Sequence, residues 1–167
     1  MNALLHQSRF VERLSLLFDD APVLFKDKIN YKKPGGSDFK PHQDIQAGWQ
    51  TYAQNFISVA IALDETTVEN GCLQIGVGNY RPELHSKMWE PMTEADLEGF
   101  SFEYVPQKPG DVIFFDGYVP HKSDHNNTSF ARRNIYLTYN PLSEGMHSVQ
   151  YYADKRANYP PDFEREG

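Results

Sequence analysis

Four side chains in two short segments have the types and spacing of a metal centre with a cation beside it. His42 and Asp44 are separated by one residue, and His121 and Arg132 lie far downstream. Successive side chains of an extended strand point to opposite faces, so His42 and Asp44 would project to the same side and could share one metal ion. The His121 imidazole would complete two histidines and one carboxylate, a set that leaves positions open on non-haem Fe(II) for oxygen chemistry. Arg132 would add a fixed cation for a dicarboxylate ligand.

Each fragment has a second interpretation when it is taken alone. A His-x-Asp triplet often occurs by chance, and His121 follows a proline in a polar segment, where a solvated imidazole is common. The order of the fragments favours a site, because the pair is followed by a distal histidine and then by Arg132 at the start of a predicted strand. Arg133 is the competing cation, but on a strand it would point away from the face that Arg132 occupies.

Composition and charge limit the class of protein. A chain of 167 residues with 40% hydrophobic residues is expected to form one domain with a real core. The formal net charge of −7 argues against nucleic acid as a partner. Cys72 is the single cysteine, which excludes an internal disulfide and agrees with a cytoplasmic location. No apolar run is long enough for a membrane span, so no membrane association is expected.

The order of predicted elements is a helix followed by many short strands. Apolar residues recur at helical spacing near the start of the chain: Phe10, Val11, Leu14, Leu17 and Phe18. Strands are predicted over 23–31, 39–45, 55–63, 72–77, 100–105, 111–115 and 132–140, and a short helix capped at Thr93 is expected between 78 and 99. The segment 55–63 is apolar at nearly every position, so it should be a central strand covered on both faces.

These elements predict an all-β fold with flanking helices. Many short strands divided by glycine and proline turns favour a jelly-roll barrel, also called a double-stranded β-helix or cupin-like barrel. Within a single domain over 1–167, we expect the N-terminal helix in 1–20, the barrel in 21–140 and a tail that packs over the sheet in 141–167. In such a barrel His42, Asp44 and His121 would converge at the open end.

The stretch from about 24 to 139 resembles the phytanoyl-CoA dioxygenase family of Fe(II)/2-oxoglutarate oxygenases. Four motifs occur in that family's order: Pro-His-Gln-Asp at 41–44, Glu-Asn-Gly-Cys-Leu at 69–73, Lys-Pro-Gly-Asp at 108–111, and Pro-His at 120–121 followed by Arg132. Family members usually carry a longer region before the barrel, so the resemblance is to an N-terminally short member.

The resemblance implies roles for five residues. His42, Asp44 and His121 would be the catalytic iron ligands, while Arg132 and Ser123 would hold the distal carboxylate of 2-oxoglutarate. The implied reaction is hydroxylation of a C–H bond of a small organic substrate, with O2 consumed and succinate and CO2 released. The implied cofactor is Fe(II), with 2-oxoglutarate and O2 as co-substrates. A monomer or a homodimer is expected.

Four further residues are weaker candidates. Lys28 lies on a predicted strand that should line the cavity, where it could contact the co-substrate, although a lysine on a solvated strand face has the same pattern. Gln46, Trp49 and Asn55 flank the His-x-Asp strand and are candidates for facing the substrate. Trp49 has a second interpretation as loop packing.

Two other classes of function use the same ligands. A cupin-like module could keep the metal site without turnover, and a Zn(II)-dependent hydrolase or isomerase could use the same three ligands. The zinc enzyme would act without oxygen and would not need Arg132. The sequence does not select a substrate among these possibilities.

Overall fold

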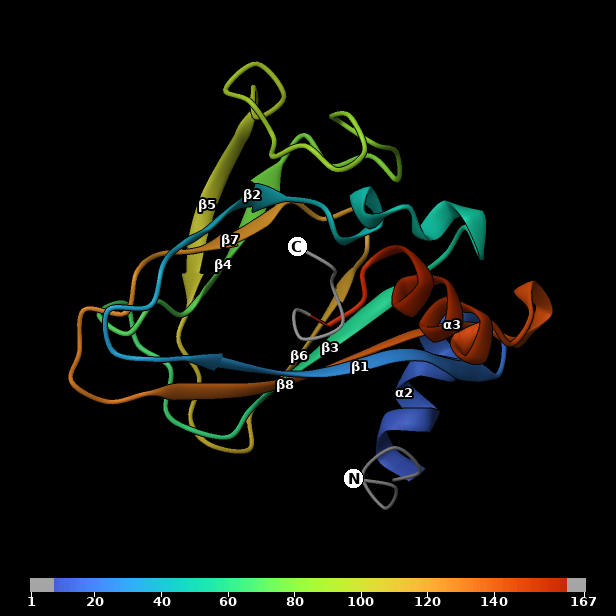
Figure 1. Ribbon diagram of the computed structural model, residues 1–167, viewed down its shortest axis with the longest axis horizontal. Coiled ribbons are helices and arrows are strands. Elements are labelled where there is room, and N and C mark those ends of the chain that lie inside the picture. The colour runs from blue at the N-terminus through green and yellow to red at the C-terminus, as the bar shows by residue number, and fades with distance from the viewer. Residues whose placement is uncertain (1–7, 162–167) are drawn as a thin grey trace.

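Eight strands form two four-stranded antiparallel sheets in the computed structural model, which describes residues 8–161 (Figure 1). The first sheet has the order β1-β8-β3-β6, from β1 (Pro22–Lys32), β8 (Arg132–Pro141), β3 (Ile57–Ala62) and β6 (Val112–Asp116). The second sheet has the order β2-β7-β4-β5, from β2 (Phe39–His42), β7 (His121–Ser123), β4 (Leu73–Gly78) and β5 (Phe100–Val105). The predicted jelly-roll is confirmed, with the difference that these two sheets do not close into a continuous barrel.

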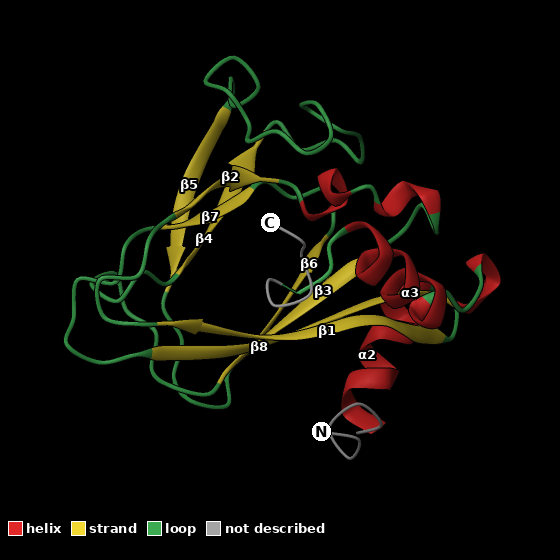
Figure 2. Cartoon of the chain, in the orientation of Figure 1, coloured by secondary structure: helices red, strands yellow, loops and turns green. Residues whose placement is uncertain are grey.

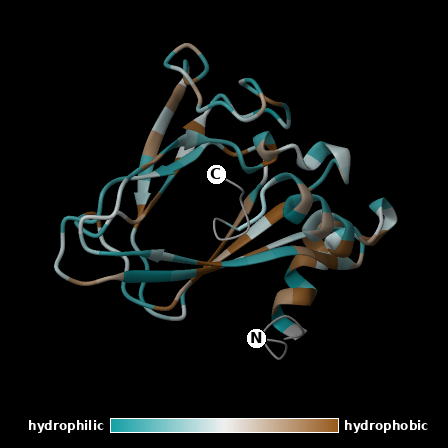
Figure 3. Ribbon diagram, viewed as in Figure 1, coloured by the Kyte–Doolittle hydropathy of each residue, from teal (hydrophilic) through white to brown (hydrophobic). Residues whose placement is uncertain are grey.

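Helix α2 (Ser8–Phe18) covers the outer face of the first sheet, as its apolar spacing predicts. The helix ends where Asp19 takes a positive φ of 53°. Figure 3 shows hydrophobic residues along α2 and along the strands that it covers. One apolar cluster joins them: Leu14, Ile57, Val59, Ile61, Ile135, Leu137 and Tyr139. All six residues of β3 are buried between β8 and β6, which confirms the predicted central strand, although it is shorter than 55–63.

The opposite face of β1 and β8 carries polar side chains. Across this pair Lys28 lies beside Tyr136, and Lys32 lies beside Arg132. The register shifts between Leu24 and Lys26, so that the extra residue forms a β-bulge. Because of this bulge Leu24 packs with the α2 cluster, whereas Lys26 faces the other side of the sheet.

A second apolar cluster lies at one end of the sheets, under the short turns that follow β2. Its buried residues are Phe25, Ile45, Trp49, Ala53, Phe56 and Tyr118. Helix α3 (Ser148–Asn158) packs on this cluster, with the Tyr151 and Phe25 ring centroids 4.6 Å apart. The tail therefore contributes a helix against β1, as the cartoon in Figure 2 shows.

Three local features of the structure differ from what the sequence predicts. The strand predicted over 39–45 ends at His42, and Asp44–Ala47 forms a short 3-10 helix, because Ile45 N donates to the Gly117 carbonyl instead of to a strand partner. Strand β7 was not predicted. The helix expected at Thr93 is a turn, in which the Thr93 backbone N–H and hydroxyl both donate to Asp96 Oδ2 at 2.7 Å. Within 8–161 no helix is long and apolar enough to cross a membrane.

Candidate metal centre

The three predicted ligands converge at one edge of the second sheet. His42 ends β2 and pairs with His121, the first residue of β7. Asp44 begins the turn that follows β2, and one ligand atom from each of the three residues lies within 4.8 Å of the others. The two imidazole ring centroids are 4.2 Å apart. The expected convergence is confirmed, even though Asp44 lies just beyond the strand.

Hydrogen bonds orient each ligand in the way a metal site requires. His42 Nδ1 lies 2.7 Å from the Lys40 carbonyl oxygen, and His121 Nδ1 lies 3.0 Å from the Val119 carbonyl oxygen. A ring that donates from Nδ1 keeps Nε2 as an unprotonated donor for a metal. Asp44 Oδ2 accepts from Ser58 Oγ at 2.7 Å, which fixes the carboxylate. Two neutral imidazole nitrogens and one carboxylate fit a divalent transition-metal ion.

The electrostatic environment favours the ligand forms of these groups. Burial would raise the pKa of Asp44, but at the low pH where Asp44 titrates the protonated His121 and the Lys26 ammonium outweigh burial and hold the pKa below its usual range. Burial, assisted by His42, lowers the pKa of His121 to about 4. The carboxylate is therefore ionised and the His121 imidazole is neutral at neutral pH, as metal ligation requires.

One pocket, called here the inner pocket, is lined by the three candidate ligands His42, Asp44 and His121 and by a buried arginine. These three ligands are called the metal set below. Arg132 lines this pocket with only 4% of its surface exposed. Its Nη2 donates to the Gly71 carbonyl at 2.6 Å and its Nη1 donates to Asn134 Oδ1 at 2.8 Å. Gly71 has a φ of 72°, and a Cβ there would collide with the Asp124 carbonyl oxygen. The Asn-Gly turn of the sequence motif therefore fixes the guanidinium beside the metal set.

Arg133 points away from the pocket, as strand alternation predicts. It is exposed and forms a salt bridge with Asp64, with an Nη2 to Oδ1 distance of 2.7 Å. Arg132 is thus the arginine that reaches the inner pocket.

Ser123 and Lys28 also line the inner pocket, and Ser123 has a partner that the sequence did not indicate. The Lys32 ammonium donates to Ser123 Oγ at 2.8 Å and to the Asp124 carbonyl. Burial, with a smaller effect of the Arg132 charge, lowers the pKa of Lys32 to about 8. Lys32 lies one residue beyond the strand predicted over 23–31, yet its even spacing from Lys28 was the signal that could have placed both lysines on the same face of one strand.

An outer pocket opens next to the inner one and shares part of its wall. Lys28, His42 and Asp44 line both pockets, so the metal set lies at their junction. Lys26 and Trp89 line the outer pocket and not the inner one. The outer pocket has a volume of about 380 Å³, which is in the range of small-molecule sites.

Two of the three candidates for substrate contact, Trp49 and Asn55, lie away from the two pockets. Trp49 is fully buried in the aromatic cluster, with ring centroids 5.5 Å from Phe25 and 5.3 Å from Phe56. Asn55 is exposed, and both its backbone N–H and its amide donate to Glu144. Neither residue lines a pocket of the metal centre, because the chain turns away after Ala47.

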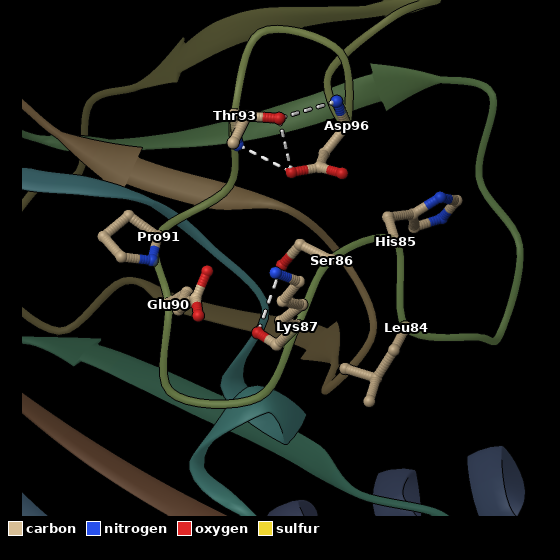
Figure 4. A pocket seen from close by; sticks show the side chains of 8 residues that line it. All are labelled: Leu84, His85, Ser86, Lys87, Glu90, Pro91, Thr93 and Asp96. Atoms are coloured by element: carbon tan, nitrogen blue, oxygen red, sulfur yellow. Dashed lines mark hydrogen bonds between the residues drawn. The ribbon is translucent and has the colours of Figure 1, made fainter.

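Gln46 does line the outer pocket, but its amide group holds the neighbouring loop. Gln46 Nε2 donates to the carbonyl oxygens of Lys87 at 3.0 Å and Glu90 at 2.6 Å. The same loop encloses a separate hollow (Figure 4), which is lined by Leu84, His85, Ser86, Thr93 and others of the segment 84–96. No metal-set residue lines that hollow.

The fold and the ligand set together define a jelly-roll protein with the two-histidine, one-carboxylate site of mononuclear non-haem metal enzymes. A family model described as "Phytanoyl-CoA dioxygenase (PhyH)" matches residues 2–134. The chain belongs to this phytanoyl-CoA dioxygenase family, which confirms the resemblance seen in the sequence.

Several proteins with similar sequences are named as oxygenases. The chain is 40% identical to a methylphosphonate hydroxylase of Gimesia maris, over 93% of this chain and 60% of the relative. It is 37% identical to a 2-aminoethylphosphonate dioxygenase of an uncultured bacterium, over 91% and 58%. The crystal structure of EctD from S. alaskensis with 2-oxoglutarate and 5-hydroxyectoine superposes with a TM-score of 0.73 at 28% identity, over 86% of this chain and 53% of that one. The chain thus spans between about half and 60% of the length of these relatives.

Proposed function

We propose that the protein is an Fe(II)- and 2-oxoglutarate-dependent dioxygenase that hydroxylates a C–H bond of a small organic substrate. In this reaction O2 is consumed and 2-oxoglutarate is converted to succinate and CO2. The observation that carries the proposal is the convergence of His42, Asp44 and His121 beside the buried Arg132 in one pocket. The crystal structures of EctD from S. alaskensis with 2-oxoglutarate and 5-hydroxyectoine, and with bound Fe, support it.

Under this proposal one group of residues would bind the metal and another would position the co-substrate. His42, Asp44 and His121 would hold Fe(II), which supplies the oxygen activation when it is bound. The planar guanidinium of Arg132 can form two parallel hydrogen bonds to a carboxylate, and Ser123 can add a third. Since Gly71 and Asn134 already fix that guanidinium, the co-substrate would meet a preorganised cation.

Succinate release provides the direct test. The purified protein, loaded with Fe(II) and given 2-oxoglutarate and O2, should release succinate, and the Asp44→Ala variant should not. Methylphosphonate and 2-aminoethylphosphonate belong among the substrates to be tried, because two relatives carry these names.

The same measurements separate the two other classes of function. Turnover of a substrate with Zn(II) in the absence of O2 would point to a hydrolase or isomerase. Tight metal binding with no succinate under any condition would point to a silent metal-binding module. Either result would contradict the proposed dioxygenase.

A further inference from the structure

Lys26 reaches the outer pocket because of the bulge in β1. The extra residue Phe25 enters the aromatic cluster, and Lys26 then pairs with Thr138 on the face that carries the metal set. Lys26 lines the outer pocket together with His42 and Asp44. β-Bulges next to active sites commonly redirect a side chain in this way. The bulge therefore places a cation at the mouth of the metal site.

The Lys26 ammonium has no hydrogen-bond acceptor in the part of the chain that the structure describes. It lies 3.8 Å from the Trp49 ring centroid, and the ring face compensates part of its charge. An ammonium has three donors, and a buried cation without acceptors is costly. Burial lowers the pKa of Lys26 to about 8 against the opposing effect of Asp44. A metal ion bound to Asp44 would weaken that opposing effect, because it would take up the charge of the carboxylate.

Two other lysines near the metal set, Lys40 and Lys32, have acceptors. Lys40 forms a salt bridge with Asp38 at 2.8 Å, and Lys32 donates to Ser123 at 2.8 Å. Lys28, which faces both pockets, has only the Tyr136 ring, with its Nζ 5.1 Å from the ring centroid. Lys26 thus lines the outer pocket and not the inner one, and among the described residues its ammonium has neither a hydrogen-bond acceptor nor a salt-bridge partner.

The cationic side chains are divided between the two pockets, with Arg132 in the inner pocket and Lys26 in the outer pocket. Arg132 and Ser123 line the inner pocket alone, and they are the residues assigned to 2-oxoglutarate under the proposed function. We infer that Lys26 binds the anionic group of the substrate, a phosphonate or carboxylate, and so holds the adjacent carbon toward the metal. This inference rests on the proposed function for the assignment of the inner pocket, but anion binding by Lys26 can be measured without turnover.

The experiment measures binding of methylphosphonate to the protein loaded with Ni(II) and 2-oxoglutarate, by calorimetry. Replacing Lys26 by Met should raise the Kd for methylphosphonate about tenfold or more, since a charge-assisted hydrogen bond is lost. Lys26→Arg should stay within a few-fold of the wild type. Lys155→Met is the matched control, because the Lys155 ammonium also lies over an aromatic ring, 5.8 Å from the Tyr151 centroid, but lines neither pocket.

Neutral and inner-pocket controls complete the design. Dimethyl methylphosphonate, the uncharged ester, should not bind measurably, and the Kd for 2-oxoglutarate should be unchanged in Lys26→Met. Propionate is titrated in the same way as a carboxylate probe. The inference is overturned if Lys26→Met binds methylphosphonate like the wild type, or if the ester binds as well as the anion. It is also overturned if the wild type binds neither methylphosphonate nor propionate. If the wild type does not bind 2-oxoglutarate or does not release succinate, this result would instead contradict the proposed function.

Discussion

Two adjacent arginines have opposite surroundings on β8. Arg132 is 4% exposed and its guanidinium is held by Gly71 and Asn134, while Arg133 pairs with Asp64 at the surface. The difference follows from strand alternation, which sends neighbouring side chains to opposite faces. The pair therefore offers a variant and a control that differ by one position.

Arg132→Gln should raise the KM for 2-oxoglutarate by about tenfold or more, because a charge-assisted pair with the distal carboxylate would be lost. Arg133→Gln should leave this KM unchanged and should change the free energy of unfolding little, because an exposed ion pair contributes little. Succinate formation at varied 2-oxoglutarate concentration measures both. An unchanged KM in Arg132→Gln would remove Arg132 from the proposed co-substrate site.

At the scale of single residues, sequence reasoning found the three side chains that converge in the candidate metal centre but misplaced some of the residues around them. His42, Asp44 and His121 could be predicted because their types and order are restrictive, and the placement of Arg132 could be predicted from strand period alone. The direction of the Lys26 side chain could not be predicted, since it depends on a bulge that no glycine or other turn residue in the sequence indicates. Trp49 lies in the aromatic cluster instead of facing a pocket, because closeness in sequence to the candidate ligands does not fix which side of a turn a side chain occupies.

At the scale of elements, α2 and the metal set lie on opposite faces of the first sheet. Leu14 of α2 is fully buried against β3 and β8, whereas Leu16 is 83% exposed. Leu14→Ala should lower the free energy of unfolding by about 2 to 5 kcal/mol, through lost transfer energy and the cavity left behind. Leu16→Ala should change it by less than about 0.5 kcal/mol. Urea unfolding of both variants measures this contrast.

The Leu14→Ala variant also tests whether packing in the apolar cluster under α2 affects metal binding on the opposite face of the first sheet. Leu14→Ala should bind Ni(II) with the affinity of the wild type, because α2 packs on β1 and on the apolar face of the first sheet, and none of the three ligands belongs to the cluster around Leu14. A large loss of metal affinity in this variant would show that the two faces of the sheet are coupled.

The elements that were missed are those whose formation depends on distant partners. Strand β7 has three residues and exists because it lies between β2 and β4. The turn after His42 is fixed by Gln43, whose Nε2 donates to the carbonyl oxygens of Tyr118 at 2.6 Å and Glu83 at 2.9 Å. No local pattern in the sequence encodes these contacts, whereas the long apolar pattern of β3 was sufficient to identify a central strand.

At the scale of the whole molecule, the metal set connects the two sheets. His42 and His121 belong to the second sheet, while Asp44 is hydrogen-bonded to Ser58 of β3 in the first. The main apolar cluster lies between the first sheet and α2, away from the metal set, and a smaller cluster of Ala60, Leu73 and Phe115 lies between the sheets. A metal ion bound by all three ligands would therefore add a link where apolar packing is limited.

Metal binding should consequently stabilise the fold as a whole. A ligand that binds only the folded state at a concentration of 100 times its Kd raises the free energy of unfolding by about 2.7 kcal/mol. Thermal or urea unfolding with Ni(II), compared with unfolding in a chelator, should show this gain in the wild type. The control is His125→Ala, which changes an exposed histidine outside the ligand set and should keep the gain, whereas His42→Ala should lose most of it. Equal stabilisation of His42→Ala by the same concentration of Ni(II) would place the metal elsewhere, since a two-ligand site cannot hold the ion with the affinity of three.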